Sequence, residues 1–134
     1  MSKSTASRAR PLSPHLSIYK PIPTMVMSIV HRITGAALYF GTLLVAIWLM
    51  AAAGTPETFA RVQAIYGSWF GLAVLFGYTW ALLHHMVGGI RHLVMDTGAA
   101  LGKEQSTTLA IAMPFVSIGL TVLVWVVAIM ARGA

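Results

Sequence analysis

The sequence predicts an all-α membrane protein with three transmembrane helices, and three observations support this fold class. The chain has 134 residues, of which 57% are hydrophobic and only 9% are charged, whereas soluble domains carry about 25% charged residues. The mean hydropathy is +0.79. Three stretches, 33–56, 62–90 and 105–131, contain no Lys, Arg, Asp or Glu. Each is longer than the ~20 residues that a helix needs to cross about 30 Å of hydrocarbon.

Residues 1–24 precede the first apolar stretch and are polar, basic and rich in proline. Proline removes a backbone donor and disfavours helix in the residue before it, so we expect a mostly extended arm. The basic start is not followed by the apolar core and cleavage site of a secretory signal. The arm is also very short for an organellar transit peptide, which favours a bacterial protein. The sequence therefore divides into an arm, 1–24, and a three-helix anchor domain, 25–134.

We expect the three helices at about 25–53, 63–94 and 106–131. Gly54-Thr55-Pro56 separates the first helix from the second, and Thr97-Gly98 ends the second. The second helix is longer than a bilayer requires, so it should tilt or extend into the aqueous layer. Pro114 lies inside the third helix, where a proline can introduce a kink.

The distribution of cations predicts the orientation. With three spans, the arm and the second loop lie on one side of the membrane. That side carries seven cationic residues, Lys3, Arg8, Arg10, Lys20, Arg32, Arg91 and Lys103, and the other side carries two, Arg61 and Arg132. Because cationic loops stay in the cytoplasm, we expect a cytoplasmic N-terminus in a bacterial inner membrane, the mitochondrial matrix being the alternative.

Composition excludes several classes of function. The chain has no cysteine, which rules out disulfides, thiolate catalysis, and iron–sulfur clusters or zinc held by its own cysteines. Its three acidic residues, Glu57, Asp96 and Glu104, are too few for a carboxylate-rich metal site. The net charge of +6 comes from cations that flank the apolar stretches. We therefore expect a lipid bilayer as the partner and no nucleic acid.

One face of the second helix carries His85, Gly88, Gly89 and His92, at spacings i, i+3, i+4 and i+7. A neutral imidazole can bind haem iron, and glycine leaves room for a flat macrocycle. The same pattern has a plainer interpretation, because glycine pairs in membranes often mark close helix packing. His84 points about 100° away from His85, so at most one of the two faces this surface.

The first helix repeats this spacing with Ser28, His31, Arg32 and Gly35. A hydroxyl and a guanidinium together can bind a carbonyl, a carboxylate or a phosphate, although Arg32 could instead reach the lipid headgroups. Arg32 lies roughly 10 Å and His85 roughly 13 Å from the cytoplasmic helix ends, at 1.5 Å per residue. Equal depth suggests one shared site. Arg32 or His31 could then neutralise haem propionates, and another subunit would supply the second axial ligand.

Three segments also carry a family resemblance: residues 10–19 (RPLSPHLSIY), 28–35 (SIVHRITG) and 85–96 (HMVGGIRHLVMD). They resemble the cytochrome b membrane-anchor subunits of succinate dehydrogenase, the respiratory complex II. The resemblance spans nearly the whole chain and includes the three-helix layout.

The resemblance implies a role for each motif residue. It implies that His85 is the axial ligand of haem b, and that Ser28 and Arg32 contribute to the ubiquinone pocket. It places His31, with Arg32 and His92, in the region of the haem propionates. Asp96 also matches the family pattern, at the cytoplasmic end of the second helix.

The implied function is to anchor succinate dehydrogenase in the membrane and to pass electrons from succinate oxidation to ubiquinone, within the tricarboxylic acid cycle and the respiratory chain. The partners would be a second membrane anchor that completes one larger helical bundle, an iron–sulfur subunit and a flavoprotein. No catalytic residue is expected in this chain alone. Three alternatives stay open: a fumarate reductase anchor, a haem-free scaffold, and, ranked last, a proton-conducting subunit.

Overall fold

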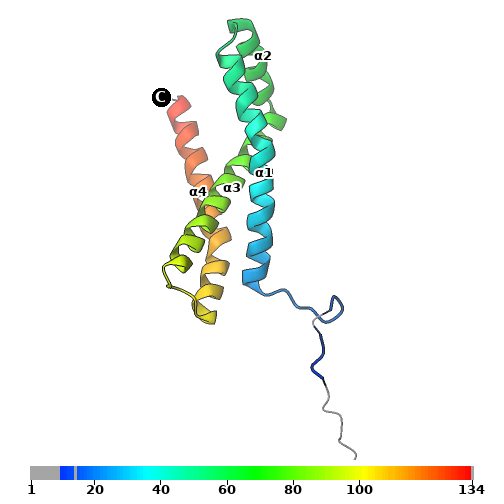
Figure 1. Cartoon of the computed structure of the whole chain (residues 1–134). Coiled ribbons are helices and arrows are strands. Elements are labelled where there is room, and N and C mark those ends of the chain that lie inside the picture. The colour runs from blue at the N-terminus through cyan, green and yellow to red at the C-terminus, as the bar shows by residue number, and fades with distance from the viewer. Residues whose placement is uncertain (1–9, 14, 134) are drawn as a thin grey trace, which may run out of the picture.

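The computed structural model describes residues 10–13 and 15–133. They form four helices, α1 (Pro23–Ala52), α2 (Pro56–Tyr66), α3 (Trp69–Asp96) and α4 (Lys103–Gly133). Three of them, α1, α3 and α4, are long and apolar enough to cross a membrane. The arm and the α3–α4 connection lie at one end of the bundle, and α2 and the C-terminus lie at the other (Figure 1). The all-helical fold with three membrane-length helices is confirmed.

The predicted second helix, 63–94, begins too early, because the chain breaks at Gly67-Ser68 into two helices, α2 and α3. The Ser68 side chain accepts a hydrogen bond from the Gly71 backbone N–H at 3.1 Å and so caps α3. Gly71 permits the tight turn, since a Cβ there would overlap the backbone carbonyls at the end of α2. Hydropathy does not detect this break because residues on both sides of it are uncharged.

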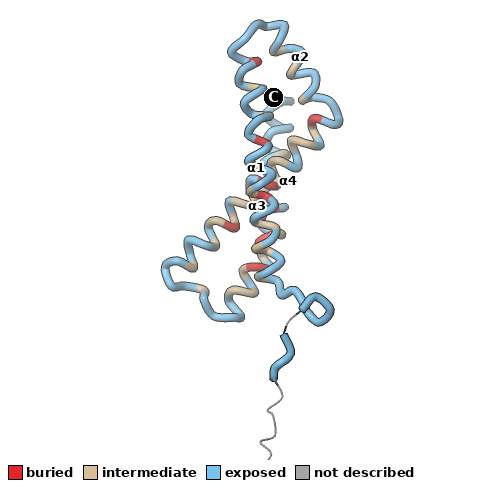
Figure 2. The backbone as a smooth tube through the Cα atoms, turned by 45° about the vertical axis from the view of Figure 1, so that its right-hand side comes forward, coloured by how far each residue is buried: buried red, intermediate tan, exposed pale blue. Residues whose placement is uncertain are grey.

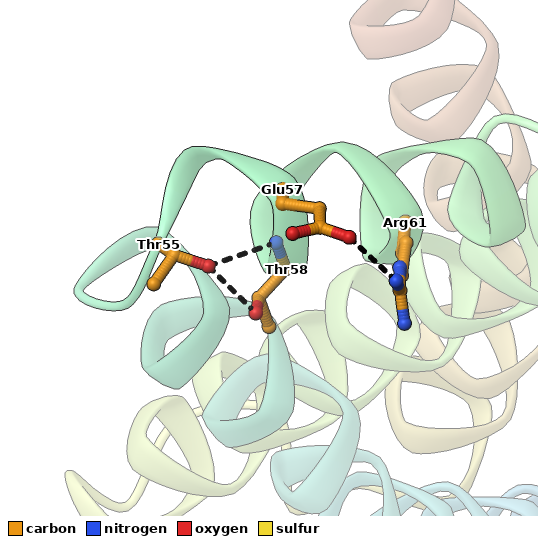
Figure 3. Close-up of polar contacts among 4 residues, drawn as sticks. All are labelled: Thr55, Glu57, Thr58 and Arg61. Carbon is orange, nitrogen blue, oxygen red and sulfur yellow. Dashed lines mark hydrogen bonds and ion pairs between the residues drawn. The ribbon is translucent and has the colours of Figure 1, made fainter.

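Helix α2 has its own start signals (Figure 3). The Thr55 hydroxyl accepts a hydrogen bond from the Thr58 backbone N–H at 3.2 Å, and Pro56 occupies the first turn, where its missing N–H costs nothing. Glu57 pairs with Arg61 at 2.6 Å on the exposed surface. A carboxylate in the first turn also favours the helix dipole.

Two hydrogen bonds fasten α2 to the end of α1. The Trp48 indole N–H donates to the Gln63 side-chain oxygen at 3.1 Å. The Tyr66 hydroxyl donates to the Leu44 carbonyl at 2.7 Å. The connection between the first two membrane helices is therefore an ordered cap rather than a simple turn.

Few side chains are buried within the chain itself, and most of the tube in Figure 2 is exposed. The buried residues of α3 and α4 are mainly small or polar: Gly71, Ala81, His84, Gly88, Ala110, Met113, Ser117 and Thr121. Lipid is as apolar as leucine, so membrane helices associate through close packing of small residues and through polar contacts. The large apolar side chains point outward, as expected for a surface that faces lipid or other subunits.

The link between α3 and α4 includes a buried polar contact that can be tested. The Ser117 hydroxyl donates to the Pro114 carbonyl at 3.0 Å, so its oxygen accepts from His84 Nδ1 at 3.0 Å. We predict that Ser117→Ala lowers the free energy of unfolding by about 0.6–1.7 kcal/mol, because the buried N–H loses its acceptor. Unfolding by SDS titration in mixed micelles measures the change.

The double variant Ser117→Ala/His84→Leu should recover most of the loss, since it removes both polar partners. Gly119→Ala is the control on α4, because an added Cβ there meets no atom within 4 Å. A Ser117→Ala variant as stable as the parent would show that the contact contributes nothing.

Candidate functional site

Helices α1 and α3 bring the two histidine patches into direct contact. The rings of His31 and His85 stack with centroids 3.9 Å apart and planes only 3° from parallel. The His92 ring lies 5.4 Å from that of His31. The equal depth inferred from the sequence therefore corresponds to contact between the two helices.

Glycines make this approach possible. A Cβ on Gly35 would lie 2.9 Å from Cε1 of His85, and a Cβ on Gly88 would overlap the His31 ring. Each histidine thus lies over a glycine of the opposite helix. Gly89 differs, because a Cβ there would meet no atom within 4 Å. Gly88 therefore packs against the neighbouring helix, as one interpretation of the glycine pair predicted, whereas Gly89 borders open space.

The orientation of His85 is set by the backbone of α1. Its Nδ1 donates to the His31 carbonyl at 3.1 Å. The Thr34 hydroxyl, 2% exposed, donates to the same carbonyl at 2.9 Å and lies 3.5 Å from Nδ1. A carbonyl can only accept, so we assign the proton to Nδ1. Nε2 then keeps a free lone pair, the arrangement typical of a histidine that binds a metal.

His84 occupies a different environment, as the 100° offset predicts. It is completely buried between α3 and α4, with Nδ1 bonded to Ser117 and Nε2 buried without a partner. The Trp80 ring lies 5.2 Å away. His85 is only partly buried, and its Nε2 is not among the buried unpartnered nitrogens. Of the two neighbours, only His85 has an unbonded ring nitrogen that is not completely buried.

Of the remaining site candidates, His92 approaches the ring of His31, whereas Ser28, Arg32 and Asp96 have no polar contact with the histidine rings among the described residues. Arg32, His92 and Asp96 are exposed, and Ser28 is partly buried. Within residues 10–13 and 15–133, the side chains of Ser28, Arg32 and Asp96 form no hydrogen bond or ion pair with one another or with the histidines. The part of the chain that the structure describes contains no group of three His, Asp or Glu residues that could hold a bare metal ion.

Sequence reasoning missed two residues near the histidines. Thr34 supports the carbonyl that holds His85, and Ser117 binds His84. Thr34 could have been found from the sequence, because it places a hydroxyl one helical turn after His31. Ser117 has no comparable signal, because its partner lies 33 residues away on another helix.

Comparisons with known proteins point to one family. The family described as "Succinate dehydrogenase/Fumarate reductase transmembrane subunit" matches residues 6–130. The succinate dehydrogenase cytochrome b556 subunit of Paracoccus denitrificans is 42% identical over 118 residues, covering 88% of this chain and 91% of that protein. The corresponding Rickettsia prowazekii subunit is 34% identical over 117 residues, covering 87% and 91%. The mitochondrial cytochrome b560 subunit of Sus scrofa is 37% identical over 100 residues, covering 73% and 59%.

The two adjacent glycines allow a matched test of this geometry. We predict that Gly88→Ala destabilises the protein by about 1–3 kcal/mol, because the new methyl group must displace the His31 ring. Gly89→Ala should leave stability nearly unchanged, since the methyl group enters open space. Unfolding of both variants in the same detergent measures the difference. Equal stability of the two variants would contradict the packing of His31 against Gly88.

Proposed function

This chain belongs to the family of transmembrane subunits of succinate dehydrogenases and fumarate reductases, and on that premise we propose that it binds haem b and helps deliver electrons to ubiquinone. It is a multi-pass membrane subunit that anchors succinate dehydrogenase. The observation that supports haem binding best is the His85 imidazole, held by a backbone carbonyl with Nε2 free. We assign no catalytic residue to the chain itself.

His85 would hold the haem iron through Nε2. When bound, the haem supplies a centre that accepts and releases one electron at a time. The His31 carbonyl accepts from Nδ1 and so fixes the plane of the imidazole, and the Thr34 hydroxyl holds that carbonyl in place. Among the described residues, only His85 combines an unbonded ring nitrogen with such support. The other histidine ligand of the haem would therefore come from a second membrane anchor. The names of the relatives, cytochrome b556 and b560 subunits, support a b-type haem.

The haem propionates would lie near His31, Arg32 and His92. His31 Nδ1 is buried against Gly88 of α3, so a propionate oxygen would reach this imidazole through its other ring nitrogen, Nε2. The exposed Arg32 guanidinium, free of any ion pair among the described residues, would offset the anionic charge.

Ubiquinone would bind beside Ser28 and Arg32, which lie one turn apart on α1. The Ser28 hydroxyl can donate a hydrogen bond to a quinone carbonyl, and Arg32 can orient the same oxygen. Negative charge develops on that oxygen as the quinone is reduced, so a cation nearby favours electron transfer to it.

We place the N-terminal arm in the cytoplasm beside a bacterial inner membrane, where the iron–sulfur and flavoprotein subunits would dock. The arm and the α3–α4 connection share one end of the bundle (Figure 1), and most cations lie there. Lys3 and Arg8, which contribute to the charge bias, lie outside the described residues.

Two other functions have support. The family description covers fumarate reductase as well, and the same groups could serve the reverse reaction with a low-potential quinone. A haem-free scaffold is favoured by one observation: His84 uses its imidazole to join two helices. The redox potential of the haem and the identity of the native quinone test the fumarate reductase function. An optical spectrum of the purified complex tests the haem-free scaffold.

We predict that His85→Ala removes the b-type band from the reduced-minus-oxidised spectrum of the purified complex, whereas His84→Ala retains it. The reason is that His85 Nε2 is unbonded and not completely buried, whereas His84 is completely buried. Subunit content on gels controls for assembly. Retention of the band in His85→Ala together with its loss in His84→Ala would reverse the assignment of the ligand.

We predict that Arg32→Leu lowers succinate:quinone reductase activity about tenfold or more, and that Ser28→Ala lowers it about two- to tenfold. These factors correspond to losing a charged and a neutral hydrogen bond. Succinate oxidation by an artificial soluble acceptor should persist, because it bypasses the membrane subunit. An equal fall in both activities would indicate failed assembly and would remove the support for a quinone site.

A further inference from the structure

A cavity of about 510 Å³ lies at the end of the bundle opposite to the histidines, a volume typical of single-ligand sites. It opens between α1, α2 and α3 beside the last turn of α4. Its walls are Gly41, Leu44, Val45, Trp48, Gln63, Tyr66, Gly67, Leu72, Leu75, Tyr78 and Arg132. Nothing in the proposed electron-transfer function uses this cavity.

The interior of the cavity is mainly apolar. Leucine side chains of α1 and α3 form much of it. The polar groups of Trp48 and Tyr66 are already bonded to Gln63 and to the Leu44 carbonyl, which holds α2 over the cavity. Gly41 lets the Tyr78 ring close one wall, since a Cβ at Gly41 would overlap that ring. Such walls suit a hydrocarbon chain.

A single cation lines the same cavity. Arg132 is exposed at the C-terminal end of α4 and, within residues 10–13 and 15–133, its side chain forms no ion pair or hydrogen bond. Arg61, the other cation at this end, is paired with Glu57. Trp48 and Tyr66 beside the cavity belong to the residue types that mark the headgroup level of a bilayer.

An apolar cavity with a free guanidinium at headgroup level matches an amphiphile with an anionic head. We propose that the cavity binds one glycerophospholipid, with an acyl chain between α1 and α3 and its phosphate on Arg132. A transmembrane segment of another subunit would need no cation at this position, and a soluble anion would need no apolar walls. The bound lipid would join α2 to the membrane helices.

Native mass spectrometry of the complete complex in detergent tests the proposal. The complex is titrated with phosphatidylglycerol and, separately, with diacylglycerol carrying the same acyl chains. We expect one phosphatidylglycerol adduct whose affinity falls about fivefold in Arg132→Gln, the factor expected for one cation near an anionic headgroup. Arg132→Lys should retain most of the affinity. Leu72→Trp, which fills the cavity, should abolish this adduct.

Two control variants isolate the site. Arg61→Gln removes the other cation at this end, and Leu82→Trp adds the same bulk to α3 outside the cavity walls; both should bind as the parent does. Equal binding of diacylglycerol, or phosphatidylglycerol binding that is unchanged in Arg132→Gln, would overturn the phosphate contact. Unchanged binding in Leu72→Trp would show that the lipid lies elsewhere. A segment of another subunit found inside the cavity of the complete complex would show the same.

Discussion

The hydrogen bond from His85 to the His31 carbonyl is the constraint on which the candidate site depends. It joins the two helices that carry the polar patches and fixes which imidazole nitrogen is free. It forms only because Gly35 and Gly88 let each ring lie against the opposite helix. In a bilayer, where apolar burial does not drive helix association, such close polar contacts determine which faces of α1 and α3 meet.

Adjacent histidines on α3 have different surroundings because a helix separates consecutive residues by about 100°. His84 faces α4 and bonds to Ser117, whereas His85 faces α1. The first contributes to packing, and the second is the residue that we propose as a haem ligand. This division also explains why a histidine-rich membrane segment is ambiguous in sequence: residue type alone does not distinguish a structural imidazole from a ligand.

The sequence predicted the three membrane helices and the meeting of the two patches, because charge-free length and helical spacing are local properties. It did not predict the break between α2 and α3, since Gly67 and Ser68 lie in an uncharged stretch. It also missed Thr34 and Ser117, whose importance depends on distant partners. The cavity beside Arg132 was not predicted for the same reason, because it is formed by four separate helices.

The small buried fraction of the membrane helices has a consequence for a copy of this chain that lacks partner subunits. Only 11–17% of the apolar 18-residue stretch of each membrane helix is buried within the chain, and the cation Arg32 is exposed. An intramembrane cation facing lipid costs about 2.5–3.5 kcal/mol. Most of the surface of α1, α3 and α4 is therefore left for lipid or for other subunits to cover, and a copy that stands alone leaves this cation without neighbours from another subunit.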